Sequence, residues 1–151
     1  MMFRTVSILA SLAVFLFAGA VNAESKKETV VSMMASSINH YNKVGAEQAF
    51  KDFAVKGGEF NKGAIYVFVS SLKGEGVIFH GANPKLVGKK LGKLKDIDGK
   101  LFVKESRDIA NGPGEGWVDY KWPHPETKKI TQKHTLIHKV GDTYFAIGYF
   151  D

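Results

Sequence analysis

The sequence predicts a single α+β domain in which a long N-terminal helix packs on a five-stranded antiparallel sheet. Two observations lead to this fold class. Apolar residues recur at helical spacing between residues 25 and 54, whereas they alternate with a period of two from residue 64 onward. The helices come first and the strands follow in runs, an order typical of α+β domains rather than of alternating α/β folds.

The helical part has two segments. Residues 25–43 carry one apolar stripe on an otherwise polar helix, and residues 46–54 predict a second, shorter helix after Gly45. Gly57 and Gly58 follow the second helix, as glycine after a last turn usually does. The stripe of the first helix consists of Val30, Met34, Ile38 and Tyr41.

Five later segments have the two-residue alternation of β-strands. In the first of them, Ile65, Val67 and Val69 share one face, and the opposite face is apolar as well. This strand is therefore expected to be covered on both sides. The five segments are residues 64–70, 76–81, 116–122, 129–138 and 143–150.

A long connection separates the second strand from the third. Residues 83–102 are rich in lysine and glycine, with isolated leucines, and a short helix is expected at residues 100–110. The long first helix is expected on one face of the sheet. This connection would then cover the other face and enclose a cavity there.

The first 23 residues have the three parts of a secretory signal peptide. Arg4 supplies a positive charge, residues 6–20 are apolar and uncharged, and small residues precede a cleavage point after Ala23. The apolar run is shorter than the roughly 20 residues that a membrane-spanning helix needs. We therefore expect a signal peptide at 1–23 and one mature domain at 24–151, with an uncleaved N-terminal membrane anchor as the alternative.

The composition narrows the classes of function. The chain has 21 Lys+Arg against 15 Asp+Glu, and nearly all of the positive charge is lysine scattered along the sequence. Proteins that read nucleic-acid bases rely on arginine for bidentate contacts, so we expect no nucleic-acid partner. The absence of cysteine excludes thiolate metal sites and cysteine nucleophiles. Together with the signal peptide, this disulfide-free composition favours the bacterial periplasm.

Five motifs follow one another in a recognisable order: EFNKGAIYVFVSS, GVIFHGANPKLVGKKL, LKDIDGKLF, GEGWVDYKWPHPETKK and GDTYFAIGYF. In this order and spacing the chain resembles the single Cache domain, type 2, over roughly residues 28–151. This family is a PAS-like extracytoplasmic sensor module of bacterial chemoreceptors and histidine kinases. The resemblance implies a PAS-like sheet that binds a small organic acid in a pocket on the face away from the long helix.

The chain departs from the family in its architecture. Family members in receptors lie between two transmembrane helices and signal to the inside of the cell. Here the domain is expected to make up the whole mature protein. This difference indicates a free periplasmic binder that passes its signal or its ligand to another protein, such as a membrane receptor or a sensor kinase.

Two tryptophans and a tyrosine gather on the strand at 116–122. Tyr120 and Trp122 share one strand face, and Trp117 lies on the other unless a bulge intervenes near Gly116. As ligand contacts, Tyr120 would supply a hydroxyl group and Trp117 a wall of the pocket. The alternative is that two of the three aromatic residues are core.

A second group of candidates lies on the first hairpin. Tyr66 and Phe68 share a face of the first strand and neighbour His80 at the end of its partner. If this face carries the pocket, Tyr66 and His80 are polar contacts and Phe68 is a wall. Alternatively, His80 closes the strand end with a hydrogen bond, or the pocket lies on the Ile65 side.

Lys133 is the sharpest candidate. It lies in the middle of a predicted strand, where lysine is disfavoured unless it faces water. By the resemblance, it follows the tryptophan–proline turn at the family's usual position, where a cation would neutralise a bound carboxylate. A charge pair in a partly dry pocket is stronger than one on the surface. The alternative is an outward-facing lysine on an edge strand, which prevents aggregation.

The other motifs do not indicate a metal site or a catalytic site. His134 and His138 are ~13 Å apart along a strand, so the pair alone cannot ligate one metal ion. Residues 96–99 lack the remaining ligands of a calcium loop and are expected to form a turn. The serines and histidines match no catalytic triad. We expect no metal, no cofactor and no enzymatic activity.

These observations predict a non-enzymatic periplasmic binding or sensor domain for a small carboxylate or similar metabolite. The alternative is a protein-interaction module that docks to a membrane receptor, has no small-molecule ligand of its own and uses its aromatic residues as core.

Overall fold

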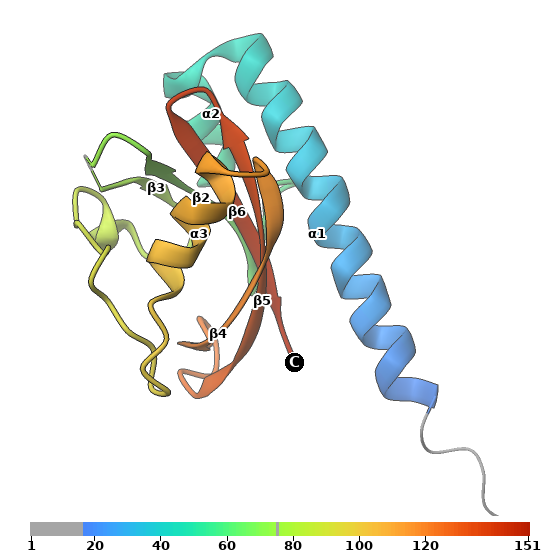
Figure 1. The fold of residues 1–151 in the computed structure, drawn as a ribbon. Helices are drawn as coiled ribbons and strands as arrows, with labels where there is room; N and C mark the ends of the chain where they lie inside the picture. Colours follow the sequence, from blue (N-terminus) through green and yellow to red (C-terminus); the bar gives the residue numbers. More distant parts are fainter. Residues whose placement is uncertain (1–16, 75) are drawn as a thin grey trace, which may run out of the picture.

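The structure, a computed structural model, describes residues 17–74 and 76–151. It contains a twisted antiparallel sheet with a long helix along one face and a short helix on the other (Figure 1). The α+β fold class and the long helix packed on an antiparallel sheet are thereby confirmed. Most of the predicted signal peptide, up to residue 16, lies outside the described residues.

The described part of the chain has three α-helices, and each overlaps a helix that the sequence predicts, although the first begins at Phe17, within the predicted signal peptide, and not at residue 25. They are α1 (Phe17–Val44), α2 (Ala46–Phe53) and α3 (Phe102–Asn111), and one 3-10 turn, η1 (Pro84–Leu86), lies in the long connection. Gly45 separates α1 from α2 with φ 83, a backbone conformation that residues with a Cβ rarely adopt. None of the helices in the described part of the chain has both the length and the hydropathy of a membrane-spanning segment.

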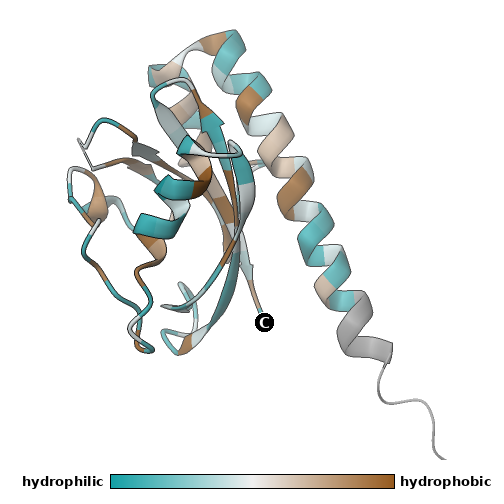
Figure 2. Cartoon of the chain, in the orientation of Figure 1, coloured by the Kyte–Doolittle hydropathy of each residue, from teal (hydrophilic) through white to brown (hydrophobic). Residues whose placement is uncertain are grey.

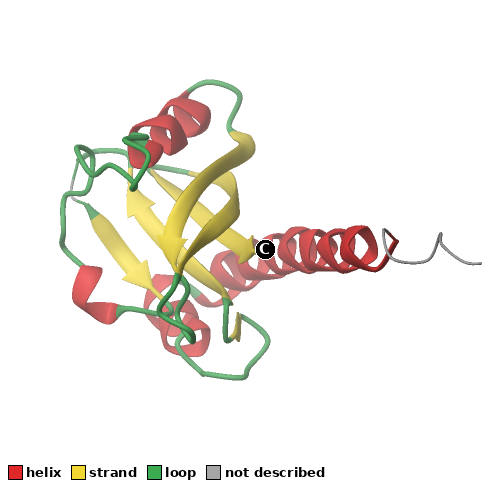
Figure 3. Ribbon diagram, turned by 90° about the horizontal axis from the view of Figure 1, so that it is seen from below, coloured by secondary structure: helices red, strands yellow, loops and turns green. Residues whose placement is uncertain are grey.

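The sheet contains the five predicted strands and one more. The predicted strands are β2 (Ile65–Ser71), β3 (Val77–His80), β4 (Glu115–Pro123), β5 (Ile130–Val140) and β6 (Thr143–Phe150). The additional strand is β1 (Asn61–Lys62), which is too short to show a periodicity in the sequence. The order is β1-β2-β6-β5-β4, with β3 also paired to β2, and every pairing is antiparallel (Figure 3).

The two faces of this sheet bury different groups. Helix α1 packs on one face, and its apolar residues lie in the part beside the sheet, whereas the preceding turn at residues 24–28 is hydrophilic (Figure 2). Helix α2 completes this layer with Phe53, which is fully buried against Phe60, Phe79 and Phe145. Helix α3 and the connection before it cover the other face, where a second core cluster forms around Tyr120.

Candidate functional site

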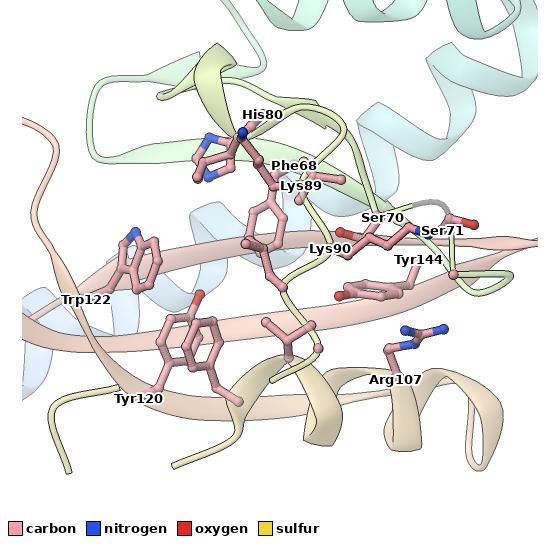
Figure 4. Close-up of a pocket in the computed structure, with 18 of the residues that line it drawn as sticks. Phe68, Ser70, Ser71, His80, Lys89, Lys90, Arg107, Tyr120, Trp122 and Tyr144 are labelled. Atoms are coloured by element: carbon pink, nitrogen blue, oxygen red, sulfur yellow. The ribbon is translucent and has the colours of Figure 1, made fainter. Parts of the chain in front are cut away.

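A cavity lies on the sheet face that α3 covers (Figure 4). Its volume is about 60 Å³, several times the roughly 10–15 Å³ that one water molecule requires. Strands β2, β4, β5 and β6 form its floor, and α3 and residues 86–92 close it. The side chains that line it include Phe68, His80, Phe102, Tyr120, Trp122 and Lys133.

Lys133 lies in the wall of this cavity with only 1% of its surface exposed. Its Nζ donates a hydrogen bond to the Tyr66 hydroxyl at 2.9 Å and lies 4.4 Å from the centre of the Tyr66 ring. The ring centres of Phe68 and Phe150 are 5.5 and 5.1 Å from the same atom. Burial lowers the pKa of Lys133 to about 7. The alternative of an outward-facing lysine on an edge strand is wrong, because β5 lies between β4 and β6.

Gly148 makes room for the Lys133 side chain. Gly148 pairs with Thr135 on β5, two residues along the strand from Lys133. A Cβ at Gly148 would lie 2.5 Å from the Thr135 hydroxyl and 2.8 Å from Lys133 Cε. The lysine stem therefore crosses the sheet above a residue without a side chain and brings its ammonium group to Tyr66. The need for glycine at this position arises from packing between β5 and β6, so the sequence alone shows only a glycine within a strand.

His80 combines the two roles that the sequence left open. Its Nδ1 accepts hydrogen bonds from the backbone N–H groups of Ala82 and Asn83 at 3.3 and 3.0 Å, which closes the end of β3. The neutral ring then carries its proton on Nε2. Burial, followed by the charge of Lys133, lowers the pKa of His80 to about 4. The ring also stacks on Phe68 (5.4 Å, 21°) and lies in the cavity wall. His80 is therefore a neutral hydrogen-bond donor at neutral pH.

Tyr120 and Trp122 form another part of the wall. Tyr120 stacks on Phe102 of α3, with ring centres 4.1 Å apart and planes at 8°. Its hydroxyl accepts a hydrogen bond from Thr135 at 3.3 Å, and burial raises its pKa. Trp122 lies edge-on to the same ring at 6.2 Å. The structure therefore places Tyr66, Phe68, His80, Tyr120 and Lys133 around one site.

Trp117 is not brought to this site. The pairing of β4 with β5 runs from Glu115 to Pro123 without a register shift, so no bulge turns Trp117 toward Tyr120. Trp117 lies on the opposite face, edge-on to Tyr149 at 6.1 Å and beneath Lys27 of α1 at 5.9 Å. The tryptophan wall of the cavity is Trp122, as strict strand alternation requires.

Sequence reasoning missed several polar residues of the cavity, of which Ser70, Tyr144 and Arg107 are the most informative. Ser70 and Tyr144 pair across β2 and β6, and both are buried. Arg107 comes from α3, and its Nη2 donates a hydrogen bond to the carbonyl of Leu72 at 2.9 Å. Alternation along β2 places Ser70 on the face of Tyr66 and could have identified it. The contribution of Arg107 depends on how α3 docks, which no local pattern encodes.

The remaining polar motifs lie at the surface. Asp96 accepts backbone hydrogen bonds from Asp98 and Lys100, so the predicted turn at residues 96–99 is confirmed. His134 contacts the carboxylates of Asp119 and Asp151, at 2.8 and 2.9 Å. The residues that the structure describes contain no cluster of three or more histidines and carboxylates able to hold a metal ion.

The fold and the cavity agree with the protein family that the sequence matches. The family model of the Cache domain matches residues 23–151. The chain belongs to the Cache domain family. The resemblance inferred from the motifs is thereby confirmed, together with the PAS-like fold. Cache domains of chemoreceptors are extracytoplasmic, non-catalytic sensor domains.

One protein with a similar sequence is a chemotaxis receptor. The methyl-accepting chemotaxis protein McpP of Pseudomonas putida is 33% identical over 83 residues, which is 55% of this chain. The chain spans 15% of the length of that relative.

Three solved Cache-like structures share the fold. The periplasmic sensor domain of a chemotaxis protein has a TM-score of 0.70 at 22% identity, covering 85% of this chain and 96% of that one. A Cache chemosensory domain solved to explain carboxylic acid recognition has a TM-score of 0.68 at 20% identity, covering 91% and 99%. A methyl-accepting chemotaxis protein from Vibrio parahaemolyticus has a TM-score of 0.72 at 17% identity, covering 87% and 92%.

Proposed function

We propose that this Cache domain binds a small carboxylate in the cavity beside Lys133 and acts as a sensor without catalysis. Its occupancy would be passed to a partner such as a membrane receptor or sensor kinase. The single observation that carries the proposal is the environment of Lys133. Its ammonium group has three donors, one of which is used by Tyr66, and none of the ion pairs of the described residues includes it.

A carboxylate would complete this environment. A cation in a dry, aromatic surrounding is costly unless an anion accompanies it. A ligand oxygen would accept the remaining Lys133 hydrogens, and the neutral His80 offers an Nε2–H donor from β3, opposite Phe68 of β2. Phe68 and Trp122 are positioned to cover the apolar part of a short acid. The similar Cache domain solved for carboxylic acid recognition supports the same class of ligand.

Phe150 offers a route from the cavity to α1. Its ring centre lies 5.1 Å from Lys133 Nζ, and its backbone carbonyl accepts a hydrogen bond from Lys26 of α1 at 2.7 Å. A ligand that shifts the ammonium group would therefore act on the strand end to which α1 is attached. We propose that α1 carries the change to the partner.

A ligand screen by thermal unfolding tests the proposal. The protein is melted with short carboxylic acids and with the corresponding uncharged amides as matched controls. We expect at least one acid to raise the melting temperature, its amide to have no effect, and Lys133→Met to abolish the shift. Lys27→Met is the control variant, because Lys27 lies on the opposite face. An acid that shifts the Lys133→Met variant as much as the wild type contradicts the proposed site.

Failure of every acid to raise the melting temperature would favour the alternative function, a module that docks to a receptor without a ligand. Direct binding to a purified receptor ectodomain would then distinguish the two.

We further propose that residues 1–23 are a cleaved signal peptide and that the protein resides in the periplasm. The exposed residues 22–25 and the family match from residue 23 support this boundary. The mass of the protein in a periplasmic fraction tests it. The expected chain begins at residue 24, and an intact N-terminus in the membrane fraction would instead indicate an anchor.

A further inference from the structure

We infer that the cavity has two anion-binding ends and that its ligand is a short dicarboxylic acid rather than a monocarboxylic one. This inference rests on the proposed function and extends it to the far end of the same cavity. Figure 4 shows Tyr120 and Trp122 at one end and Tyr144 and Arg107 at the other, with Phe68 between them.

The far end is polar and cationic although it is largely buried. Ser70 and Ser71 bring two buried hydroxyl groups from the end of β2, and Tyr144 brings a third from β6. Arg107 faces this group from α3 and is held there by its hydrogen bond to the Leu72 carbonyl. Four donors from three separate elements therefore converge on one end of the cavity.

Arg107 is the strongest anion binder of this group. Its guanidinium group has five N–H donors in a planar fork, which matches a carboxylate in bidentate geometry. One of these donors is used by Leu72, and no carboxylate of the described residues forms an ion pair with it. Among the described residues that line the cavity there are four cations and no Asp or Glu. The four cations are Lys89, Lys90, Arg107 and Lys133.

The placement of the two ends along β2 favours an extended ligand. Ser70 lies four residues beyond Tyr66 on β2, a backbone spacing of ~13 Å along a regular strand, with a register irregularity between Val69 and Ser70. Lys133 Nζ is bonded to the Tyr66 hydroxyl, so it lies toward the other end of this strand segment from Ser70. Phe68, midway between Tyr66 and Ser70, has the apolar surface that a short methylene chain would contact. A monocarboxylate held at Lys133 would leave the Arg107 end without an anion, whereas a dicarboxylate would fill both ends.

A matched ligand series tests this inference by titration calorimetry on the full chain. Succinate, γ-hydroxybutyrate and butyrate have similar length but carry a carboxylate, a hydroxyl or a methyl group at the second end; glutarate and adipate extend the series. We expect the best diacid to bind at least about tenfold more tightly than the monoacid of equal length. An equal or higher affinity for butyrate overturns the inference.

Three variants test which residues give the diacid its higher affinity. Arg107→Gln should remove the advantage of the diacid and leave the affinity for butyrate within about twofold, whereas Lys133→Met should weaken both ligands. Ser70→Ala, which leaves the Arg107–Leu72 bond in place, should weaken the diacid selectively. Lys104→Gln is the matched control, because Lys104 is a cation of the same helix that pairs with Asp108 at the surface.

The outcomes separate the inference from the proposed function. If butyrate binds in a Lys133-dependent manner and the diacid has no advantage, the inference fails and the proposed function stands. If neither acid binds, both fail. A diacid advantage that survives in Arg107→Gln and in Ser70→Ala also overturns the inference. Melting temperatures of each variant without ligand show whether a loss of binding reflects a loss of folding.

Discussion

The two faces of the sheet are formed by the same strands but bury different side chains: one face buries mainly apolar rings, and the other buries polar and charged groups as well. On the α1 face the core is mainly aromatic and apolar: the Phe53 ring centre lies 6.2 Å or less from the ring centres of Phe60, Phe79, Phe145 and His40. On the α3 face, Lys133, Tyr66, Tyr120 and Tyr144 are buried with their polar groups around a cavity. The α1 face stabilises the fold by apolar burial, whereas the buried polar groups and the cavity of the α3 face lower the stability that this face contributes and leave space for a ligand.

The difference explains the position of α3 and of the long connection. Helix α3 contributes Phe102 against Tyr120 at one end and Arg107 near Tyr144 at the other. The connection adds backbone pairing: the Val77 N–H donates a hydrogen bond to the Lys89 carbonyl at 3.1 Å, and the Val77 carbonyl accepts one from the Gly88 N–H at 2.8 Å, which holds residues 88–89 beside β3.

Removal of a ring from the α1 face should have the largest effect on stability. We expect Phe53→Ala to lower the free energy of unfolding by about 3–5 kcal/mol, because the fully buried ring leaves a cavity among its neighbours. Phe68→Ala, the matched change on the cavity face, should cost less, because that ring already borders empty space, but should weaken ligand binding. Urea denaturation measures both, and an equal loss in the two variants would contradict the contrast between the faces.

Removal of the buried charge should act in the opposite direction. We expect Lys133→Met without ligand to be more stable than the wild type at pH 7 by about 1–4 kcal/mol, because an unpaired cation is replaced by an apolar chain of similar shape.

The pH dependence of this difference follows from linkage. The pKa of Lys133 is lowered from 10.5 to about 7 in the folded state, so the unfolded chain binds more protons between these values. The stability of the wild type should therefore rise with pH in this window, and its gap to Lys133→Met should narrow. Urea melts at several pH values measure the gap; a constant gap would show that Lys133 keeps its proton when buried.

Carboxylate affinity should depend on pH in the reverse sense. The bound anion needs the protonated ammonium group, and Lys133 loses its proton above pH about 7. We expect affinity to be level below this value and to fall by up to about tenfold per pH unit above it. His80 remains neutral throughout, since its pKa is about 4. Calorimetry from pH 6 to about 9 measures the profile, and an affinity that is constant across it would exclude Lys133 as the anchor.

The two tryptophans give the smallest and most specific test, because one lies on each face. We expect a ligand to change the fluorescence of Trp122, in the cavity wall, and not that of Trp117 beside Tyr149. Trp122→Phe should therefore remove the ligand-dependent signal, whereas Trp117→Phe should keep it, with little change in stability for either. The reverse pattern would move the ligand to the α1 face.

The order of elements and the faces of the strands were readable without a structure. The helical stripe of Val30 and Met34 and the double-sided apolar pattern of β2 predicted which elements exist and that both faces of the sheet are covered. These features depend on residues close together in the sequence, whose side-chain directions are fixed by the helical and strand periods. The same rule separated Trp117 from Tyr120, and the structure follows it.

What the sequence could not decide is which groups meet across elements. Its lysine in mid-strand gave two opposite expectations, and only the sheet order, which makes β5 an interior strand with Gly148 beside it, buries that charge against Tyr66. The approach of Arg107 to Tyr144 and Ser70 likewise requires the docking of α3. Local periodicity determined the elements of this protein, whereas long-range packing, which has no local signature, determined the chemistry of its cavity.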